Sequence, residues 1–191
     1  PFQTCPVITS RRVDRMEVPQ EVLLRARGGD RPAFREVMDR LAKPTYNIAW
    51  RMTYNAADAE DLTQEIFLRL FQNLRMYDAA QPFVPWFRRL ATNLCLNWKQ
   101  RVANRPMNKL NDLDPGAAGP EPEDRDVRLQ RAIQELPPEY QMCVTLKYLE
   151  DLGIEEIAGS LKVPTGTVKT WLFRAREMLK DKLKPHLERM I

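Results

Sequence analysis

A polar arc near the C-terminus carries side chains whose types and spacing suit contact with duplex DNA: Lys169, Thr170, Phe173 and Arg174. Basic residues such as Lys169 and Arg174 can reach phosphates or guanine edges, and Phe173 can pack on a thymine methyl group. At about 100° per residue, the opposite arc of the same helix is apolar and is predicted to be buried: Val168, Leu172, Ala175, Leu179 and Leu183. Seven Lys or Arg residues stand against two acids between residues 162 and 184, so the surrounding field is strongly positive.

These side chains stand on the second of two short helices predicted between residues 154 and 176. Apolar residues recur at helical spacing from Ile154 to Leu161. Pro164 ends this first helix, because proline disfavours helix for the residue before it, and Thr165 is predicted to cap the second. The pair is a predicted helix-turn-helix, whose second helix can enter the major groove. The alternative is a small helical domain with a solvated basic face. The turn, the cap, the apolar stripe and the charge all favour the helix-turn-helix.

Composition narrows the class of protein. The 191 residues are 43% hydrophobic and 29% charged, with a net charge of +4, which permits nucleic-acid binding without requiring it. No apolar run is long enough for a membrane span, and we expect no membrane insertion. The cysteines, Cys5, Cys95 and Cys143, are odd in number and far apart, which favours a reduced, cytoplasmic protein. The single histidine, His186, has no cysteine or nucleophile nearby, so we expect no metal, no cofactor and no catalytic residues.

The sequence predicts an all-α fold of two small helical domains joined by a flexible linker. Residues 1–17 are predicted to be a flexible leader, and 18–105 a first domain. Residues 106–124 are predicted to be an acidic linker rich in Pro and Gly, and 125–191 a second domain of four helices with the helix-turn-helix. Helices in the first domain are expected at 21–27, 32–51, 58–74 and 85–102, with Pro44 kinking or splitting the second.

The helix at 58–74 has one oddity on its polar side. Its apolar face is broad and predicted to be buried: Leu62, Ile66, Phe67, Leu70, Phe71 and Leu74. Leu68 lies opposite, between acidic and amide side chains. Leu68 is either a lone exposed leucine, which is common, or the anchor of a partner-binding face where Asp61 and Glu65 pair with partner cations.

The segment from residue 82 to 101 mixes aromatic and basic side chains, which suits single-stranded nucleic acid, because bases stack on rings while guanidinium groups meet phosphates. The sequence predicts that one set of side chains points away from the core: Arg88, Arg89, Thr92 and Lys99. The alternative is that the aromatic residues belong to the core, which we favour for Phe87 and Trp98. Tyr77 and Phe83 are assigned to the preceding loop, residues 76–84, where a flipped-out base could be held.

Three motifs together resemble the group 4, or extracytoplasmic function (ECF), sigma factors of bacterial RNA polymerase. Residues 58–68 (DAEDLTQEIFL) resemble region 2.2 of that family, and residues 85–93 (PWFRRLATN) resemble region 2.3. Residues 136–140 (LPPEY), followed by 164–176, resemble region 4 with its helix-turn-helix. The order and spacing of the motifs extend the resemblance over about residues 18–190. Asn97 differs from the family, which often has aspartate there.

The resemblance implies a role for each surface. Residues implied to contact the polymerase core, through the β′ coiled coil, are Asp58, Asp61, Gln64, Glu65, Leu68 and Gln72. Residues implied to capture and melt the minus-ten element are Tyr77, Phe83, Trp86, Arg88, Arg89, Asn93 and Lys99. Residues implied to read the minus-thirty-five element are Thr167, Lys169, Thr170, Phe173, Arg174 and Arg176. The implied partners are RNA polymerase core, including its β flap, promoter DNA and an anti-sigma factor.

Two other classes of protein compete with this interpretation. A stand-alone operator-binding regulator would use the same helix-turn-helix, but it needs a dimer interface matched to half-site spacing, and no dimerisation helix is evident. A nucleic-acid enzyme would need a metal site at Asp58, Glu60 and Asp61, and no second acidic cluster completes it. The stand-alone regulator also leaves the aromatic and basic segment unexplained.

Overall fold

The structure is a computed structural model that describes residues 16–103 and 124–187, with side-chain surroundings for 16–103 and 128–184. The described residues form helices and connecting turns without a β-strand, so the all-α prediction is confirmed for them. Nearly all of the predicted leader (1–17) and of the predicted linker (106–124) lies outside the described residues.

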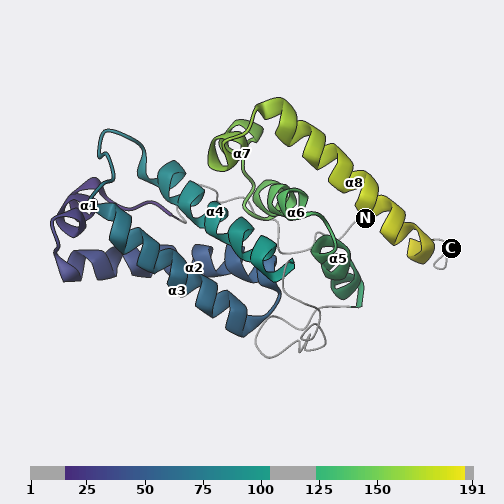
Figure 1. Cartoon of the computed structure of the whole chain (residues 1–191), viewed down its shortest axis with the longest axis horizontal. Helices are drawn as coiled ribbons and strands as arrows, with labels where there is room; N and C mark the ends of the chain where they lie inside the picture. Colours follow the sequence, from purple (N-terminus) through teal and green to yellow (C-terminus); the bar gives the residue numbers. More distant parts are fainter. Residues whose placement is uncertain (1–15, 104–123, 188–191) are drawn as a thin grey trace, which may run out of the picture.

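Four helices make up the N-terminal half (Figure 1): α1 (Gln20–Arg27), α2 (Arg31–Thr53), α3 (Ala56–Leu74) and α4 (Phe83–Ala103). Helix α1 ends at a pair of glycines, and Gly29 adopts a φ of 96°, a left-handed conformation that favours glycine. Asp30 then caps α2, because its carboxylate accepts a hydrogen bond from the Ala33 amide at 3.1 Å. Asn55 caps α3 in the same way through the Asp58 amide at 3.0 Å.

Of the two outcomes predicted for Pro44, a kink or a split of the second helix, the split does not occur. Helix α2 runs through Pro44 as a single element. Its buried stripe continues on both sides of the proline, through Leu41 before it and Ile48 after it, and both side chains are fully buried. Packing along the whole stripe therefore offsets the backbone hydrogen bond that proline cannot donate.

The C-terminal half contains α5 (Asp124–Gln134), α6 (Pro138–Val144) with a π-helical extension η1 (Thr145–Leu149), α7 (Ile154–Leu161) and α8 (Thr165–Leu187). Helix α7 starts after Gly153, whose amide donates to the Glu156 carboxylate at 2.7 Å. It ends at Leu161, and the next residue, Lys162, takes a left-handed conformation. Helix α8 begins at Thr165, one residue earlier than predicted, because the Pro164 carbonyl already accepts from the amides of Thr167 and Val168.

The buried apolar side chains of the two halves belong to one contiguous cluster. Its largest fully buried members in the N-terminal half include Leu41, Ile66 and Phe87, and those in the C-terminal half include Met142 and Ile157. Helix α4 packs on α2 and α3 on one side and on α6 and α7 on the other, as its central place in Figure 1 shows. Helix α8 packs only on elements of its own half, α5, α6 and α7, among the main helix pairs.

Candidate nucleic-acid and partner interfaces

The arc of α8 that the sequence predicts to face DNA is exposed. Phe173 has 58% of its surface exposed, and the side chains around it are also exposed, except that Thr167 is half-buried: Lys169, Thr170, Arg174 and Arg176. On the opposite side, Val168, Leu172 and Ala175 are buried, as predicted, whereas Leu179 and Leu183 are only half-buried. A helix that buries one stripe and leaves its basic and aromatic arc free has the geometry needed to enter a major groove.

Contacts with Tyr140 and Gly166 position side chains of this exposed arc of α8, which we call the recognition arc. Trp171 is half-buried and lies 6.3 Å from the Tyr140 ring, centroid to centroid, so it packs at the edge of the helix-turn-helix. The Arg174 guanidinium lies 3.5 Å from the Tyr140 hydroxyl. The Thr170 hydroxyl donates to the Gly166 carbonyl of its own helix at 2.9 Å. The contact with Tyr140 therefore positions the Arg174 guanidinium while the side chain stays exposed to solvent.

Aromatic residues of the loop before α4 and of the first turn of α4 form a cluster that is largely buried. Helix α4 starts at Phe83, two residues before the predicted start. The assignment of Phe83 to the loop is therefore wrong. Tyr77 and Phe83 are 5% and 6% exposed, and their rings meet edge to face at 5.5 Å. Trp86 lies 4.9 Å from Tyr77, and the Tyr77 hydroxyl donates to the Gln81 carbonyl. Burial, with Asp78 nearby, raises the pKa of Tyr77, so its hydroxyl stays neutral.

Tyr77 and Phe83 line one wall of a hollow of about 680 Å³. The other walls come from Val18, Pro19 and Leu23 at the start of α1 and from the loop itself. Because both rings already pack against each other, neither offers two open faces to a base. This region presents instead a hollow with one aromatic wall, whose lining also includes the charged side chains of Glu17 and Arg40.

The basic side of α4 differs from its prediction. Thr92, predicted to point away from the core, is fully buried, and its hydroxyl donates to the Ser160 carbonyl of α7 at 3.3 Å. Arg88 and Lys99 are half-buried, and burial lowers the pKa of both side chains. Arg89 is also half-buried, whereas Asn93 is exposed. The reason for the difference is a second packing partner, the C-terminal half, which covers part of this side.

Helix α3 presents an exposed apolar patch. Leu68 is 57% exposed, as its position on the polar arc predicts. Phe71, predicted to be buried, is 60% exposed, and its ring lies 5.2 Å from the Phe34 ring, centroid to centroid, in an edge-to-face arrangement. The surrounding predicted contact residues are exposed at Asp61, Gln64 and Gln72 and half-buried at Asp58 and Glu65. The predicted burial of Phe71 is wrong because this residue lies on the border of the apolar face, where periodicity does not distinguish buried positions from exposed ones.

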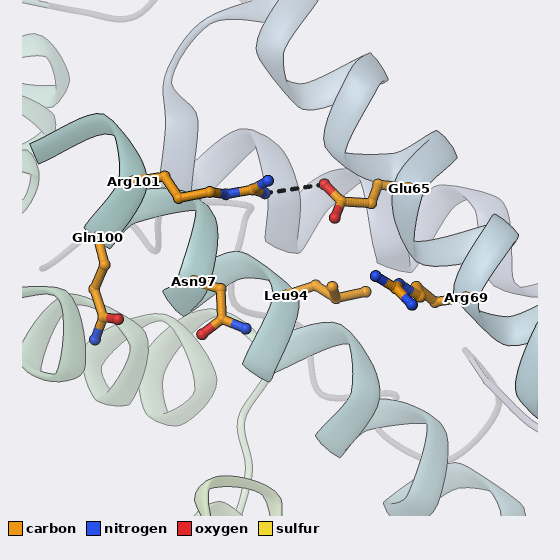
Figure 2. Close-up of a pocket in the computed structure, with 6 residues that line it drawn as sticks. All are labelled: Glu65, Arg69, Leu94, Asn97, Gln100 and Arg101. Carbon is orange, nitrogen blue, oxygen red and sulfur yellow. Dashed lines mark hydrogen bonds and ion pairs between the residues drawn. The ribbon is translucent and has the colours of Figure 1, made fainter. Parts of the chain in front are cut away.

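Between α3 and α4 lies a second hollow, of about 440 Å³ (Figure 2). Arg101 of α4 reaches across it to Glu65 of α3, with 3.1 Å between Nη2 and Oε2. Leu94 and Arg69 point toward each other across the same gap, and Asn97 and Gln100 complete the lining. An exposed ion pair of this kind is weak, so Glu65 remains available to a competing cation.

The described residues lack two other kinds of feature. No group of three potential metal ligands of the His, Cys, Asp or Glu type occurs among them. None of the helices seen in residues 16–103 and 124–187 combines the length and the apolarity that a membrane crossing requires. Cys95 and Cys143 are buried free thiols, and burial raises the pKa of each to about 12.

Comparison with known proteins identifies what the two halves are similar to. Residues 37–105 match the family model for sigma-70 region 2, and residues 126–179 match that for sigma-70 region 4. The ECF RNA polymerase sigma factor SigW of Bacillus subtilis is 34% identical over 176 residues, covering 82% of this chain and 91% of that protein.

Solved structures share the fold. CnrH in complex with the cytosolic domain of CnrY superposes with a TM-score of 0.66 at 19% identity, covering 87% of this chain and 97% of that one. The sigma factor RpoE in complex with the anti-sigma factor NepR from Bartonella quintana gives a TM-score of 0.61 at 17% identity, covering 79% and 96%.

Proposed function

The chain belongs to the ECF RNA polymerase sigma factors of the sigma-70 family, and from that membership we propose how its surfaces share the work of promoter recognition. A sigma factor recognises promoters for RNA polymerase, and we propose that this one acts without catalysis of its own. The observation that carries the proposal is that regions 2 and 4 occur in one chain, each with an exposed surface suited to a different partner.

We assign the minus-thirty-five element to the exposed arc of α8. Its basic side chains, Lys169, Arg174 and Arg176, can reach phosphates and guanine edges, while Phe173 can contact a thymine methyl group. The exposure of Phe173 supports this role, since an aromatic side chain placed in water loses apolar burial unless a partner covers it. Thr167 and Thr170 stand at the N-terminal end of α8, the end that inserts first in helix-turn-helix proteins.

We assign the minus-ten element to the start of α4 and the loop before it. We propose that the hollow walled by Tyr77 and Phe83 takes an unstacked base, and that Arg89 and Asn93, further along α4, contact the strand that carries it. Trp86 packs on the same cluster and would extend its aromatic wall. Arg88 belongs to this surface only when the C-terminal half does not cover it, and Lys99 only when it leaves its hydrogen bond to the Met52 carbonyl of α2.

We assign the polymerase core to α3. Leu68 and Phe71 form an apolar centre, and Asp61, Gln64 and Gln72 form an exposed polar rim. An apolar centre within a polar rim is the usual composition of a protein interface. Glu65 joins this rim if a cation of the polymerase displaces Arg101.

Some features of the proposal rest on the family alone. The two domains are proposed to be residues 18–105 and 125–191, linked by 106–124. A cytoplasmic location follows from the proposed role with bacterial polymerase. An anti-sigma partner is proposed because a related fold, RpoE, occurs in complex with the anti-sigma factor NepR. A stand-alone operator-binding regulator is disfavoured, because it has no use for the N-terminal half that matches region 2.

Reconstituted transcription tests the proposal. The protein is mixed with bacterial core polymerase and a library of randomised promoters, and transcripts are selected and sequenced. We expect specific transcription from promoters that share an upstream and a downstream element. Failure to stimulate any promoter, together with failure to bind core polymerase, would contradict the proposed function.

A further inference from the structure

The surface of α3 proposed for polymerase contact continues onto the start of α2. Helices α2 and α3 are joined by a short turn and pack on each other. Figure 1 shows the start of α2 and the end of α3 at the same end of the molecule, beside α1. There the Phe34 and Phe71 rings meet edge to face, with 5.2 Å between their centroids. The apolar centre formed by Leu68 and Phe71 is therefore bordered by side chains of both helices.

Three exposed arginines border this apolar centre where the two rings meet, and we call them the arginine end: Arg31, Arg35 and Arg75. Arg31 lies three residues before Phe34 on α2, and Arg75 lies four residues after Phe71, at the end of α3. Residues at these spacings share one face of a helix. The arginine end and the apolar centre therefore belong to one surface.

No carboxylate of the described residues neutralises the arginine end. The acids next to it in sequence are engaged elsewhere, because Asp30 pairs with Arg25 at 2.7 Å and Glu36 pairs with Arg40 at 2.9 Å. The first turn of α2 carries Arg31 and no acid. A cation at the start of a helix opposes the helix dipole, which favours acids there. The stability of α2 therefore does not explain Arg31.

The opposite end of the same surface is acidic. Glu60 and Asp61 are exposed in the first half of α3, and Leu68 lies midway between Asp61 and Arg75. At ~1.5 Å per residue, Asp61 and Arg75 are about 21 Å apart along the helix. The surface thus runs from carboxylates through an apolar centre to guanidinium groups.

We propose that RNA polymerase core presents the complementary arrangement to this surface: carboxylates over the arginine end, apolar side chains over Leu68 and Phe71, and cations over Asp61. This inference rests on the polymerase contact proposed above for α3. Unlike charges at the two ends of a contact fix the direction in which a partner segment lies, because the reversed placement brings like charges together. The arginine end would thus set the orientation of polymerase on α3.

The apolar centre favours a protein over a nucleic acid as the occupant. Leu68 is 57% exposed and Phe71 is 60% exposed, directly beside the arginine end. A protein interface buries apolar side chains of this kind within a polar rim, whereas a phosphate backbone offers them no apolar partner. The carboxylates of Glu60 and Asp61 would also repel phosphates.

Charge reversal tests the proposal through the sign of its effect. Arg31→Glu and Arg75→Glu are compared with Lys43→Glu, which makes the same change of charge at another exposed position of α2. Lys43 lies nine residues after Phe34, about two and a half turns, and therefore on the opposite side of the helix. Binding of the full-length variants to fluorescently labelled core polymerase is titrated at low and at high salt.

We expect Arg31→Glu and Arg75→Glu each to weaken core binding about three- to tenfold at low salt, and Lys43→Glu to change it little. High salt should reduce the difference, because it screens exposed charges. Asp61→Arg, at the other end, should also weaken core binding. Circular dichroism and thermal unfolding check folding, and Arg31→Glu should not be destabilised, since an acid in the first turn interacts favourably with the helix dipole.

Tighter core binding by Arg31→Glu and Arg75→Glu would overturn the proposal, because the facing surface of polymerase would then be basic. Unchanged core binding by both variants would also overturn it, because the arginine end would lie outside the contact. In that case, weaker binding of the same variants to a DNA strand or duplex would assign the arginine end to phosphates. Failure of the proposed function gives a different pattern, in which the unmodified protein itself does not bind core polymerase.

Discussion

Helices α4 and α8 both carry basic and aromatic side chains proposed to contact DNA, yet they sit differently in the molecule. Helix α8 packs on its own half, and its polar arc is exposed at Phe173 and Arg174. Helix α4 packs on both halves, and its polar side is buried at Thr92 and half-buried at Arg88. The comparison shows that an amphipathic pattern identifies a free surface only when the helix has neighbours on one side.

The largest expected effect is a difference in stability between two alanine substitutions, one at a phenylalanine of α4 and one at a phenylalanine of α8. Phe87 of α4 is fully buried, and Phe87→Ala should lower the free energy of unfolding by about 3–5 kcal/mol, because it leaves a cavity in the core. Phe173 of α8 is exposed, so Phe173→Ala should change stability little while weakening promoter binding. Urea unfolding measures the first effect and promoter-binding titrations the second. Equal destabilisation by both changes would remove the contrast between the helices.

A second prediction concerns the patch on α3. Leu68→Arg places a charge at the centre of the proposed polymerase contact and should cost at least about 2 kcal/mol of core binding. Duplex binding by α8, which stands on the other half, should be unchanged. Leu24 of α1 is also an exposed leucine, so Leu24→Arg is the control. Loss of core binding and duplex binding together would show that Leu68 has a merely structural role.

A third prediction sharpens the assignment of α8. Arg174→Ala should weaken binding to a promoter with an intact minus-thirty-five element by about 1–3 kcal/mol if Arg174 reads a base. Lys180→Ala removes an exposed charge further along α8 and serves as the control. Titrations on promoters altered one base pair at a time are the measurement. A loss that is the same on every promoter would mean that Arg174 contacts phosphate.

The smallest expected effect is a pH dependence confined to the N-terminal half. The Ala33 amide, followed by Arg25, lowers the pKa of Asp30 below its ordinary value of 3.8. The stabilisation from ionised Asp30 is therefore complete above about pH 4 and fades as the pH falls through the lowered pKa. Helix α8 has no such carboxylate among its first residues. Asp30→Asn keeps a capping side chain, and it should reduce the fall of the melting temperature as the pH is lowered through the acid range. The same fall in the variant as in the unchanged protein would contradict this.

Much of the candidate site followed from residue order. Apolar spacing located Val168, Leu172 and Ala175 in the core, and thereby left Phe173 on the outside. The same reasoning placed Leu68 on the surface of α3. These inferences hold because side chains three and four positions apart share a face, a property that chain geometry alone imposes.

Sequence alone determined where the helices run, which stripe of each is most apolar, and that regions 2 and 4 share one chain. Tertiary structure decided how many sides of a helix are covered. The partner of Thr92 is the carbonyl of Ser160, 68 residues further along the chain, and no local pattern encodes such a contact. Phe71 was left exposed and Pro44 was kept inside a helix for the same reason: burial depends on neighbours that only folding brings together.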